Sequence, residues 1–207
     1  MCVPPRAWKR ALGLLKTAGM KVLAVFGILK PPMRNAAVFI DGSNLVSNLQ
    51  QRGWPAFIDL DYLAVKLVNN DKLVHIYYSF SSPHPKVPAD IKIEQQRYHD
   101  ILRTVPSISL GEGWRSPPDY LEKAVDVKLA INLVMMARNN DYDVAYLITS
   151  DSDLVPAVDM VRDIGKEVVY VYFYDKYLPK EQRRFSFRLS QATNSKEAFK
   201  KDWARLI

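Results

Sequence analysis

Cysteine and histidine are scarce in this chain of 207 residues. It contains one cysteine, Cys2, and three histidines, His75, His84 and His99. A single cysteine excludes a disulfide within the chain and is typical of a reducing compartment, so we expect the protein to be cytoplasmic. Histidines without partnering cysteines do not form a zinc-binding pattern. The composition therefore excludes a disulfide scaffold and gives no indication of zinc.

Long hydrophobic runs are also missing. The apolar run at residues 22–29 is far shorter than the roughly 20 residues that cross a bilayer. It resembles the core of a signal peptide, but no small-residue cleavage site follows it. We therefore predict no membrane span.

Acidic residues are absent from the first 40 positions, which hold seven basic residues. Apolar side chains recur there at helical spacing with cations beside them, a pattern typical of a basic amphipathic helix. We interpret residues 1–34 as a basic leader. Two interpretations stay open: a weak contact with a membrane or nucleic acid, or a dispensable extension before a domain that begins at Met33.

The excess of positive charge is confined to that leader. Of the 29 basic residues, seven lie in the first 40 positions, which leaves 22 basic and 22 acidic residues in the rest of the chain. The body is thus formally neutral, although the whole chain has a net charge of +7 and a pI of about 9.4. The pI is therefore poor evidence that the folded domain binds nucleic acid.

Short runs of β-branched and aromatic residues alternate with helical patterns along the chain. A length of 207 residues is enough for one domain with a full core. The alternation predicts an α/β sandwich of three layers with a mainly parallel, five-stranded sheet. The expected strands are 37–40, 73–80, 108–110, 144–149 and 168–173, and the expected helices are 44–51, 59–69, 88–104, 122–138 and 152–164.

Carboxylates follow two of the buried strands. Asp41 comes directly after the first strand, and Asp151 and Asp153 come after the fourth. Ligands of open α/β sheets bind beyond the carboxyl ends of the strands. Asp126 stands at the head of the apolar face of the helix 122–138, so the spacing predicts that it turns toward the sheet. If the first and fourth strands are neighbours, these four aspartates meet at one edge.

A cluster of four carboxylates needs positive charge nearby to offset the repulsion between them. Two carboxylates about 5 Å apart repel by roughly 3 kcal/mol at an effective dielectric of 20. An all-oxygen set suits Mg²⁺ or Mn²⁺, with Asn44 adding an amide oxygen, and such ions support displacement at phosphorus. Simpler interpretations stay open: Asp41 and Asp151 as helix caps, and Lys123 as the partner that neutralises Asp126.

Three separated motifs resemble one family. They are AVFIDGSN at 37–44, EKAVDVKLA at 122–130 and SDSDLVP at 150–156, followed by GKEV at 165–168. In this order they resemble the NYN domain family of the PIN-like, FLAP-nuclease-like superfamily, in its bacterial LabA-like branch. The resemblance covers about residues 35–195 and leaves 196–207 as a C-terminal helical tail.

The resemblance implies a strand order of 3-2-1-4-5 and a divalent-metal-dependent ribonuclease site. Its acidic positions are Asp41, Asp126, Asp151 and Asp153, with Asn44 and Lys123 as companions. Three positions depart from the family pattern: Ala124 and Ser150 replace glycines, and Asn132 replaces an aspartate frequent in relatives. The loss of charge at position 132 bears on catalytic strength rather than on fold.

We therefore expect an RNA endonuclease that uses Mg²⁺ or Mn²⁺. The alternative is an NYN module that binds RNA or regulates a partner without turnover. A phosphohydrolase with Asp41 as covalent nucleophile is disfavoured, because position 43 is not an aspartate. A homo-oligomer is compatible with the sequence. The candidates for substrate binding are Ser43, Ser150, Ser152, Arg97, Arg115 and Lys176, with Trp114 as a stacking surface.

Overall fold

The computed structural model describes residues 33–173 and 185–207, so the predicted leader lies almost entirely outside the described residues. Residues 34–207 form one compact unit. In the described part of the chain, every helix is too short or too polar to cross a membrane.

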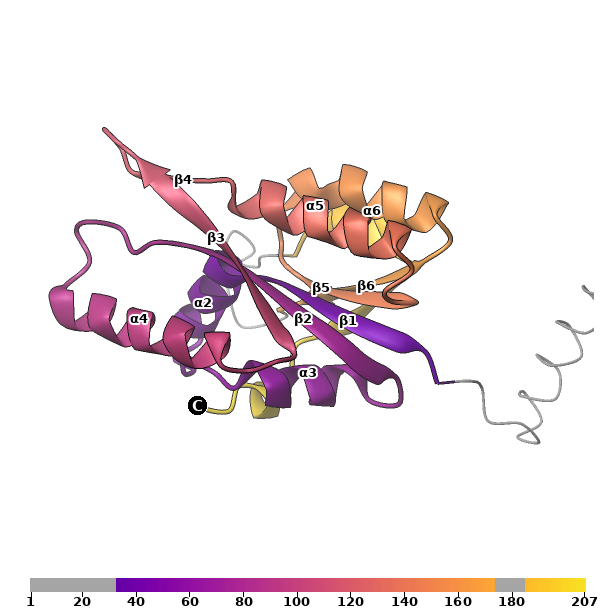
Figure 1. Ribbon diagram of the computed structural model, residues 1–207, viewed down its shortest axis with the longest axis horizontal. Coiled ribbons are helices and arrows are strands. Elements are labelled where there is room, and N and C mark those ends of the chain that lie inside the picture. Colours follow the sequence, from indigo (N-terminus) through magenta and orange to yellow (C-terminus); the bar gives the residue numbers. More distant parts are fainter. Residues whose placement is uncertain (1–32, 174–184) are drawn as a thin grey trace, which may run out of the picture. The chain divides into compact units, whose positions relative to one another are not determined.

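A mostly parallel sheet of seven strands forms the centre of the unit, in the order β4-β3-β2-β1-β5-β6-β7 (Figure 1). Only the pairing of β4 with β3 is antiparallel in this sheet of described residues. The α/β class is confirmed. The strands are β1 (Asn35–Asp41), β2 (Lys72–Ser81), β3 (Ile108–Ser116), β4 (Leu121–Lys123), β5 (Val144–Ile148), β6 (Glu167–Tyr172) and β7 (Ser195–Ala198).

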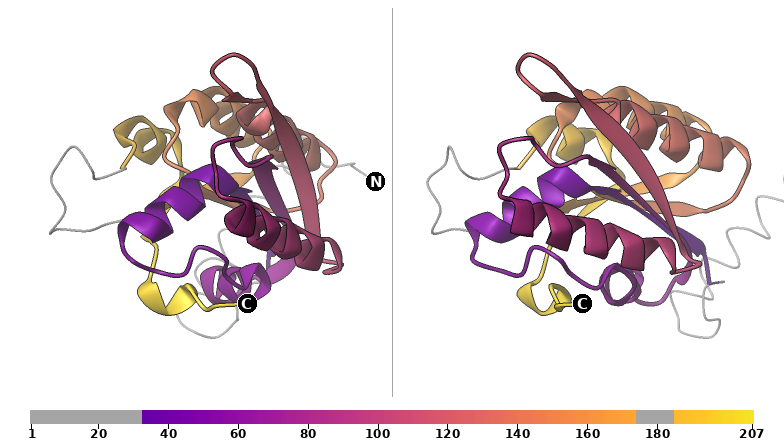
Figure 2. Two further views of the ribbon diagram at one scale, coloured as in Figure 1. Left: turned by 90° about the vertical axis from the view of Figure 1, so that its left-hand side faces the viewer. Right: turned by 60° about the vertical axis from the view of Figure 1, so that its left-hand side comes forward.

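Helices cover both faces of the sheet. In Figures 1 and 2, α5 and α6 lie on one face, and α2, α3 and α4 lie on the other. The helices are α2 (Gly42–Gln51), α3 (Leu60–Val68), α4 (Ala89–Arg103), α5 (Val125–Arg138), α6 (Val155–Asp163) and α7 (Phe187–Ala192), with short 3-10 turns at Ser152–Leu154 and Lys201–Trp203.

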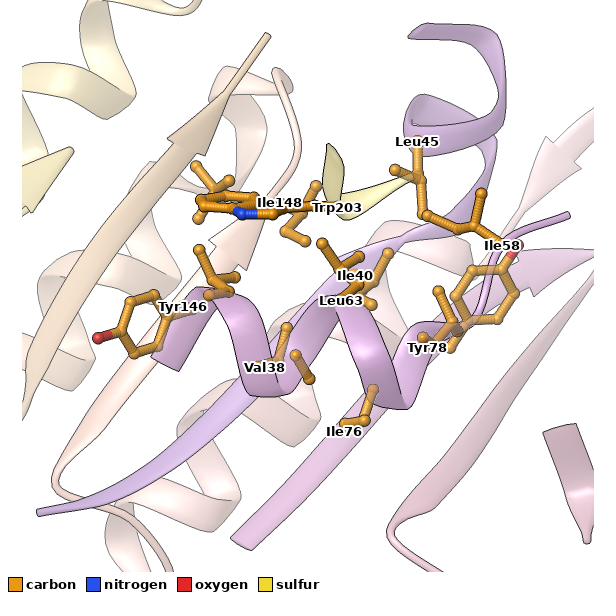
Figure 3. Close-up of a cluster of buried hydrophobic side chains, with 14 of the residues drawn as sticks. Val38, Ile40, Leu45, Ile58, Leu63, Ile76, Tyr78, Tyr146, Ile148 and Trp203 are labelled. Atoms are coloured by element: carbon orange, nitrogen blue, oxygen red, sulfur yellow. The ribbon is translucent and has the colours of Figure 1, made fainter. Parts of the chain in front are cut away.

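Each face of the sheet has its own hydrophobic core. Successive side chains of a strand point to opposite faces. Val38 and Ile40 of β1 therefore join the core under α2 and α3, which Figure 3 shows, while Phe39 joins the core under α5 and α6. This double burial explains why β1 is an unbroken apolar run rather than an alternating one.

The expected count of five strands is too low. The third strand, expected to end at position 110, continues as β3 to Ser116, and the chain then turns back as β4. Gly113 allows this pairing, because a Cβ there would lie 2.4 Å from the carbonyl oxygen of Lys123. The helix predicted from position 122 begins instead at Val125, because Ala124 has a left-handed backbone with φ of 65°.

The C-terminal residues also enter this unit. β7 pairs with β6 as the last strand of the sheet. Trp203 is 3% exposed and belongs to the core under α2 and α3, and Ile58 forms an isolated bridge with Leu206. The segment expected as a helical tail thus supplies a strand and a core side chain.

Candidate functional site

Asp41 is the last residue of β1 and the N-cap of α2. Its Oδ1 accepts a hydrogen bond from the backbone N–H of Asn44, and its Oδ2 accepts one from the hydroxyl of Thr149, both at 3.0 Å. Burial raises the pKa of Asp41 to about 6, and the charges of Asp126 and Glu122 contribute to the rise. Asp41 therefore caps a helix and also carries a charge that the fold disfavours.

The carboxyl end of β5 lies beside that of β1, because the two strands pair in parallel. Polar residues that follow them therefore meet. The side-chain amide of Asn44 donates to Oγ of Ser150 at 2.8 Å, and the backbone N–H of Asp151 donates to the hydroxyl of Thr149 at 3.1 Å. Two segments about a hundred residues apart are thus bonded into one rim.

Asp126 belongs to the same rim. It lies in the first turn of α5, whose buried positions are Val125, Leu129, Leu133 and Ala137. The prediction that Asp126 turns into the core is therefore wrong: it keeps a solvent-exposed side. Partial desolvation raises its pKa, and the charges of Asp151, Glu122 and Asp153 raise it further. The charge of Asp126 in turn raises the pKa of Asp41. Asp126 therefore lies within electrostatic reach of the carboxyl ends of both β1 and β5.

Asp151 precedes a short 3-10 turn, Ser152–Leu154, that leads into α6, and Asp153 lies within this turn. Asp151 caps this turn by accepting the backbone N–H of Asp153 at 2.9 Å. Ser152, between them, is half-buried. The carboxylate of Asp153 is exposed and borders an apolar groove between α5 and α6, so it lies at the margin of the cluster.

Glu122 is a fifth carboxylate, which the sequence analysis missed. Its Oε1 accepts hydrogen bonds from Ser43 at 2.7 Å, from Ser81, and from the guanidinium of Arg115 at 2.7 Å. We expected position 122 to open a helix, where an acidic residue is unremarkable. The available signal was Arg115, seven residues earlier, which pairs with Glu122 across the β3–β4 turn.

Two of the cationic side chains predicted for the site, Lys123 and Arg115, lie on the hairpin of β3 and β4. Lys123 is exposed on β4 opposite Trp114, so it does not neutralise Asp126 from the preceding turn of a helix. Arg115 donates to the carbonyls of Ser82 and Tyr120 as well as to Glu122, so it holds the hairpin together.

Two further cations remain to be placed. Arg97 is exposed on α4, and Lys176 lies outside the described residues. Among the described residues, Arg97 makes no bond to the acidic rim.

The donor atoms of this rim fit a hard cation. They are carboxylate oxygens from Asp41, Asp126 and Asp151, with the amide of Asn44 beside them, and Mg²⁺ and Mn²⁺ prefer such ligands. Among residues 33–173 and 185–207, however, no three Asp, Glu, His or Cys side chains form a closed set of ligands. Repulsion between uncompensated carboxylates favours this spread, so ion binding would require side-chain rotation.

The comparisons with known proteins bear on the family and the fold. No curated protein matches the chain. A crystal structure of a protein of unknown function, VPA0982 from Vibrio parahaemolyticus, is similar in fold, with a TM-score of 0.61 and 17% sequence identity over 84% of this chain and 98% of that one. Residues 35–190 match the NYN domain, whose members are typically nucleases and bind nucleic acid. The chain belongs to the NYN domain family, within the PIN-like superfamily.

Proposed function

We propose that this protein is a ribonuclease that hydrolyses internal phosphodiester bonds of RNA with Mg²⁺ or Mn²⁺. The observation that carries the proposal is the state of Asp41. The residue is 5% exposed, and its pKa is raised to about 6. The charged groups that contribute to this rise are two further carboxylates, Asp126 and Glu122. A buried acid held among like charges costs stability, and such costs concentrate at functional sites.

Asp41, Asp126 and Asp151 would hold the ion, with the amide oxygen of Asn44 as a neutral donor. A bound ion would lower the pKa of a coordinated water and offset charge on the phosphate. Hydrogen bonds from the backbone N–H of Asn44 and from Thr149 fix the carboxylate plane of Asp41. The amide of Asn44 is itself held by Ser150 and Asn48. These contacts would orient the ligands before substrate arrives.

The hairpin of β3 and β4 offers a surface for the RNA strand. Trp114 is 54% exposed and faces Lys123 across the hairpin, so a base could stack on the indole while the ammonium contacts phosphate. Arg97 and Lys176 stay candidates for phosphate contacts. The guanidinium of Arg115 already donates hydrogen bonds within the hairpin and to Glu122. Because the body is formally neutral, we expect modest affinity with a shallow dependence on salt.

Cleavage assays on the full chain test this proposal. Single-stranded and structured RNAs are incubated with Mn²⁺, Mg²⁺ or EDTA, using wild type, Asp41→Asn and the control Asp159→Asn, an exposed residue of α6. We expect cleavage only with metal, a loss of about 100-fold or more in Asp41→Asn, and no change in the control. Cleavage that survives EDTA, or that is equal in Asp41→Asn, contradicts the proposal.

A second candidate is an RNA-binding module without turnover. Two observations favour it: the described residues hold no closed ligand set, and Asn132 contributes no charge but donates to the carbonyl of Lys128 at 2.9 Å. On this account RNA binds equally well to wild type and Asp151→Asn, and neither cleaves it. Metal-dependent cleavage by wild type would reject this candidate.

A further inference from the structure

A cleft of about 310 Å³ lies next to the acidic rim, between α2 and α4. Phe57, Phe80, Val87 and Ile91 supply apolar walls, and Gln95 and His99 supply polar groups. Small-molecule sites share this mixture of mostly apolar walls and a few polar groups, and this volume is at the lower end of their range. The cleft therefore suits a small, partly polar ligand.

His99 is the unusual residue of this cleft. It is 3% exposed, and its ring lies 3.7 Å from the ring of Phe80, centroid to centroid. Burial and the nearby charge of Arg103 lower the pKa of His99 to about 4, so the imidazole is neutral at pH 7. Within the described part of the chain it makes no hydrogen bond.

A neutral imidazole presents one N–H donor and one nitrogen acceptor. Neither nitrogen of His99 is a fully enclosed atom without a partner, so both remain accessible from the cleft that the residue lines. The cleft thus holds a donor and an acceptor that are ready for a ligand.

The charge of the cleft narrows the class of that ligand. Among its described lining residues the formal charges are Glu122 and Arg115, and these two are hydrogen-bonded to each other at 2.7 Å. A phosphate or a cation would find no free counter-charge there. A neutral, planar heterocycle with hydrogen-bonding edges fits apolar walls and an unpaired imidazole better.

The cleft and the acidic rim share residues. Ser43, Ser81 and Glu122 line the cleft, and the charge of Glu122 raises the pKa of both Asp41 and Asp126. A strand with a phosphate over the carboxylates would therefore have a neighbouring base within reach of the cleft. Proteins that bind single-stranded RNA commonly take unstacked bases into such pockets.

We propose that this cleft holds one nucleobase of the bound RNA strand, next to the phosphate that lies over the carboxylates, and that His99 reads the edge of that base. The inference rests on the proposed function for its substrate. It adds a nucleotide preference at one position beside the scissile bond. Gln95, at the same cleft, is the second candidate for contact with the base.

Binding is measured first, without turnover. The full chain has three histidines, so the imidazole signals of His75, His84 and His99 are few enough to assign by NMR with His75→Phe and His99→Phe. In EDTA, the protein is titrated with AMP, GMP, CMP, UMP or ribose 5-phosphate. We expect saturable shifts of the His99 signal with at least one nucleotide and none with ribose 5-phosphate. No shift with any nucleotide, or equal shifts with ribose 5-phosphate, overturns the inference.

Cleavage then separates this inference from the proposed function. His99→Phe keeps an aromatic ring and removes both nitrogens, and we expect it to lower cleavage at preferred sites about tenfold and to flatten the nucleotide preference. His75→Phe, on β2 outside the cleft, is the matched control and should cleave like wild type. If His99→Phe unfolds at assay temperature, Gln95→Ala is used, with the same loss of preference expected.

The possible outcomes are distinguishable. Nucleotide binding at His99 without any RNA cleavage by wild type would contradict the proposed nuclease activity but support the proposed base pocket. Cleavage by wild type with unchanged site preference in His99→Phe or Gln95→Ala would support the nuclease and overturn the base pocket.

Discussion

The hydroxyl of Thr149 donates a hydrogen bond to Oδ2 of Asp41 over 3.0 Å, between residues 108 positions apart. The oxygen of the same hydroxyl accepts the backbone N–H of Asp151 at 3.1 Å. One buried side chain therefore orients the carboxylate at the end of β1 and fixes the backbone that carries the next carboxylate.

Replacing this hydroxyl should weaken the fold more at neutral than at acidic pH. Thr149→Val leaves one oxygen of Asp41 without its donor, so we expect a loss of about 1–3 kcal/mol in the free energy of unfolding at pH 7. The hydrogen bond lowers the pKa of Asp41, so its loss raises that pKa further and penalises the ionised form. Urea titrations at pH 5 and pH 7 measure the difference. Thr104→Val, at the exposed C-cap that follows α4, should change the free energy of unfolding little, and equal losses at both pH values would contradict the account.

Asp41→Asn should stabilise the protein while removing function. The folded pKa of Asp41 is about 6, against an ordinary value of 3.8, so the folded state binds the proton more tightly. The penalty is absent below about pH 4 and complete above about pH 6, and a shift of two units corresponds to about 3 kcal/mol.

An asparagine can keep both contacts, because its oxygen accepts from Asn44 and its amide donates to Thr149. Urea unfolding from pH 4 to pH 7.5, in EDTA, should therefore show the variant gaining on wild type as pH rises, by up to about 3 kcal/mol. A difference that does not depend on pH would mean that Asp41 is not held at a raised pKa.

Arg115→Ala should act on stability. The guanidinium donates three hydrogen bonds that hold the hairpin and Glu122. Its removal leaves a carboxylate beside Asp41 without its cation, so we expect a loss of about 2 kcal/mol in the free energy of unfolding. Arg97→Ala, on the exposed face of α4, should change it by less than about 0.5 kcal/mol. If Arg115→Ala unfolds like wild type but binds RNA more weakly, the side chain serves the substrate instead.

Ala124→Gly should raise the melting temperature. Ala124 precedes α5 with φ of 65°, a conformation that costs an L-residue about 1 kcal/mol and glycine little. Relief of about 1 kcal/mol corresponds to a rise of roughly 2–4 °C for a chain of this size. Ala130→Gly, within α5, should lower the melting temperature by a similar amount. A fall in both variants would argue against strain at position 124.

The sequence predicted the two strand ends that carry Asp41 and Asp151, but it did not predict the hairpin beside them. Asp41 and Asp151 were predictable because each follows an unbroken apolar run, and such runs are typical of strands buried on both faces. Their adjacency came from the family resemblance, and β1 does pair with β5.

Glu122 and the true start of α5 were not predictable from local pattern. Helical spacing extends back to position 122. The helix starts later because residues 121–123 pair with β3 and because Ala124 has a left-handed backbone, and both features depend on the three-dimensional fold. The inward turn expected for Asp126 failed for a related reason. A helical stripe specifies which residues share a face, but one step around the axis separates the buried Val125 from the exposed Asp126.

Titration calorimetry with Mn²⁺ at pH 7.5 tests most directly whether the separate carboxylates act as one site. We expect wild type and Asp159→Asn to bind alike, and Asp41→Asn, Asp126→Asn and Asp151→Asn each to lose affinity by at least about tenfold, because each removes a ligand of the same ion. Equal Mn²⁺ binding by wild type and all three variants would contradict the account.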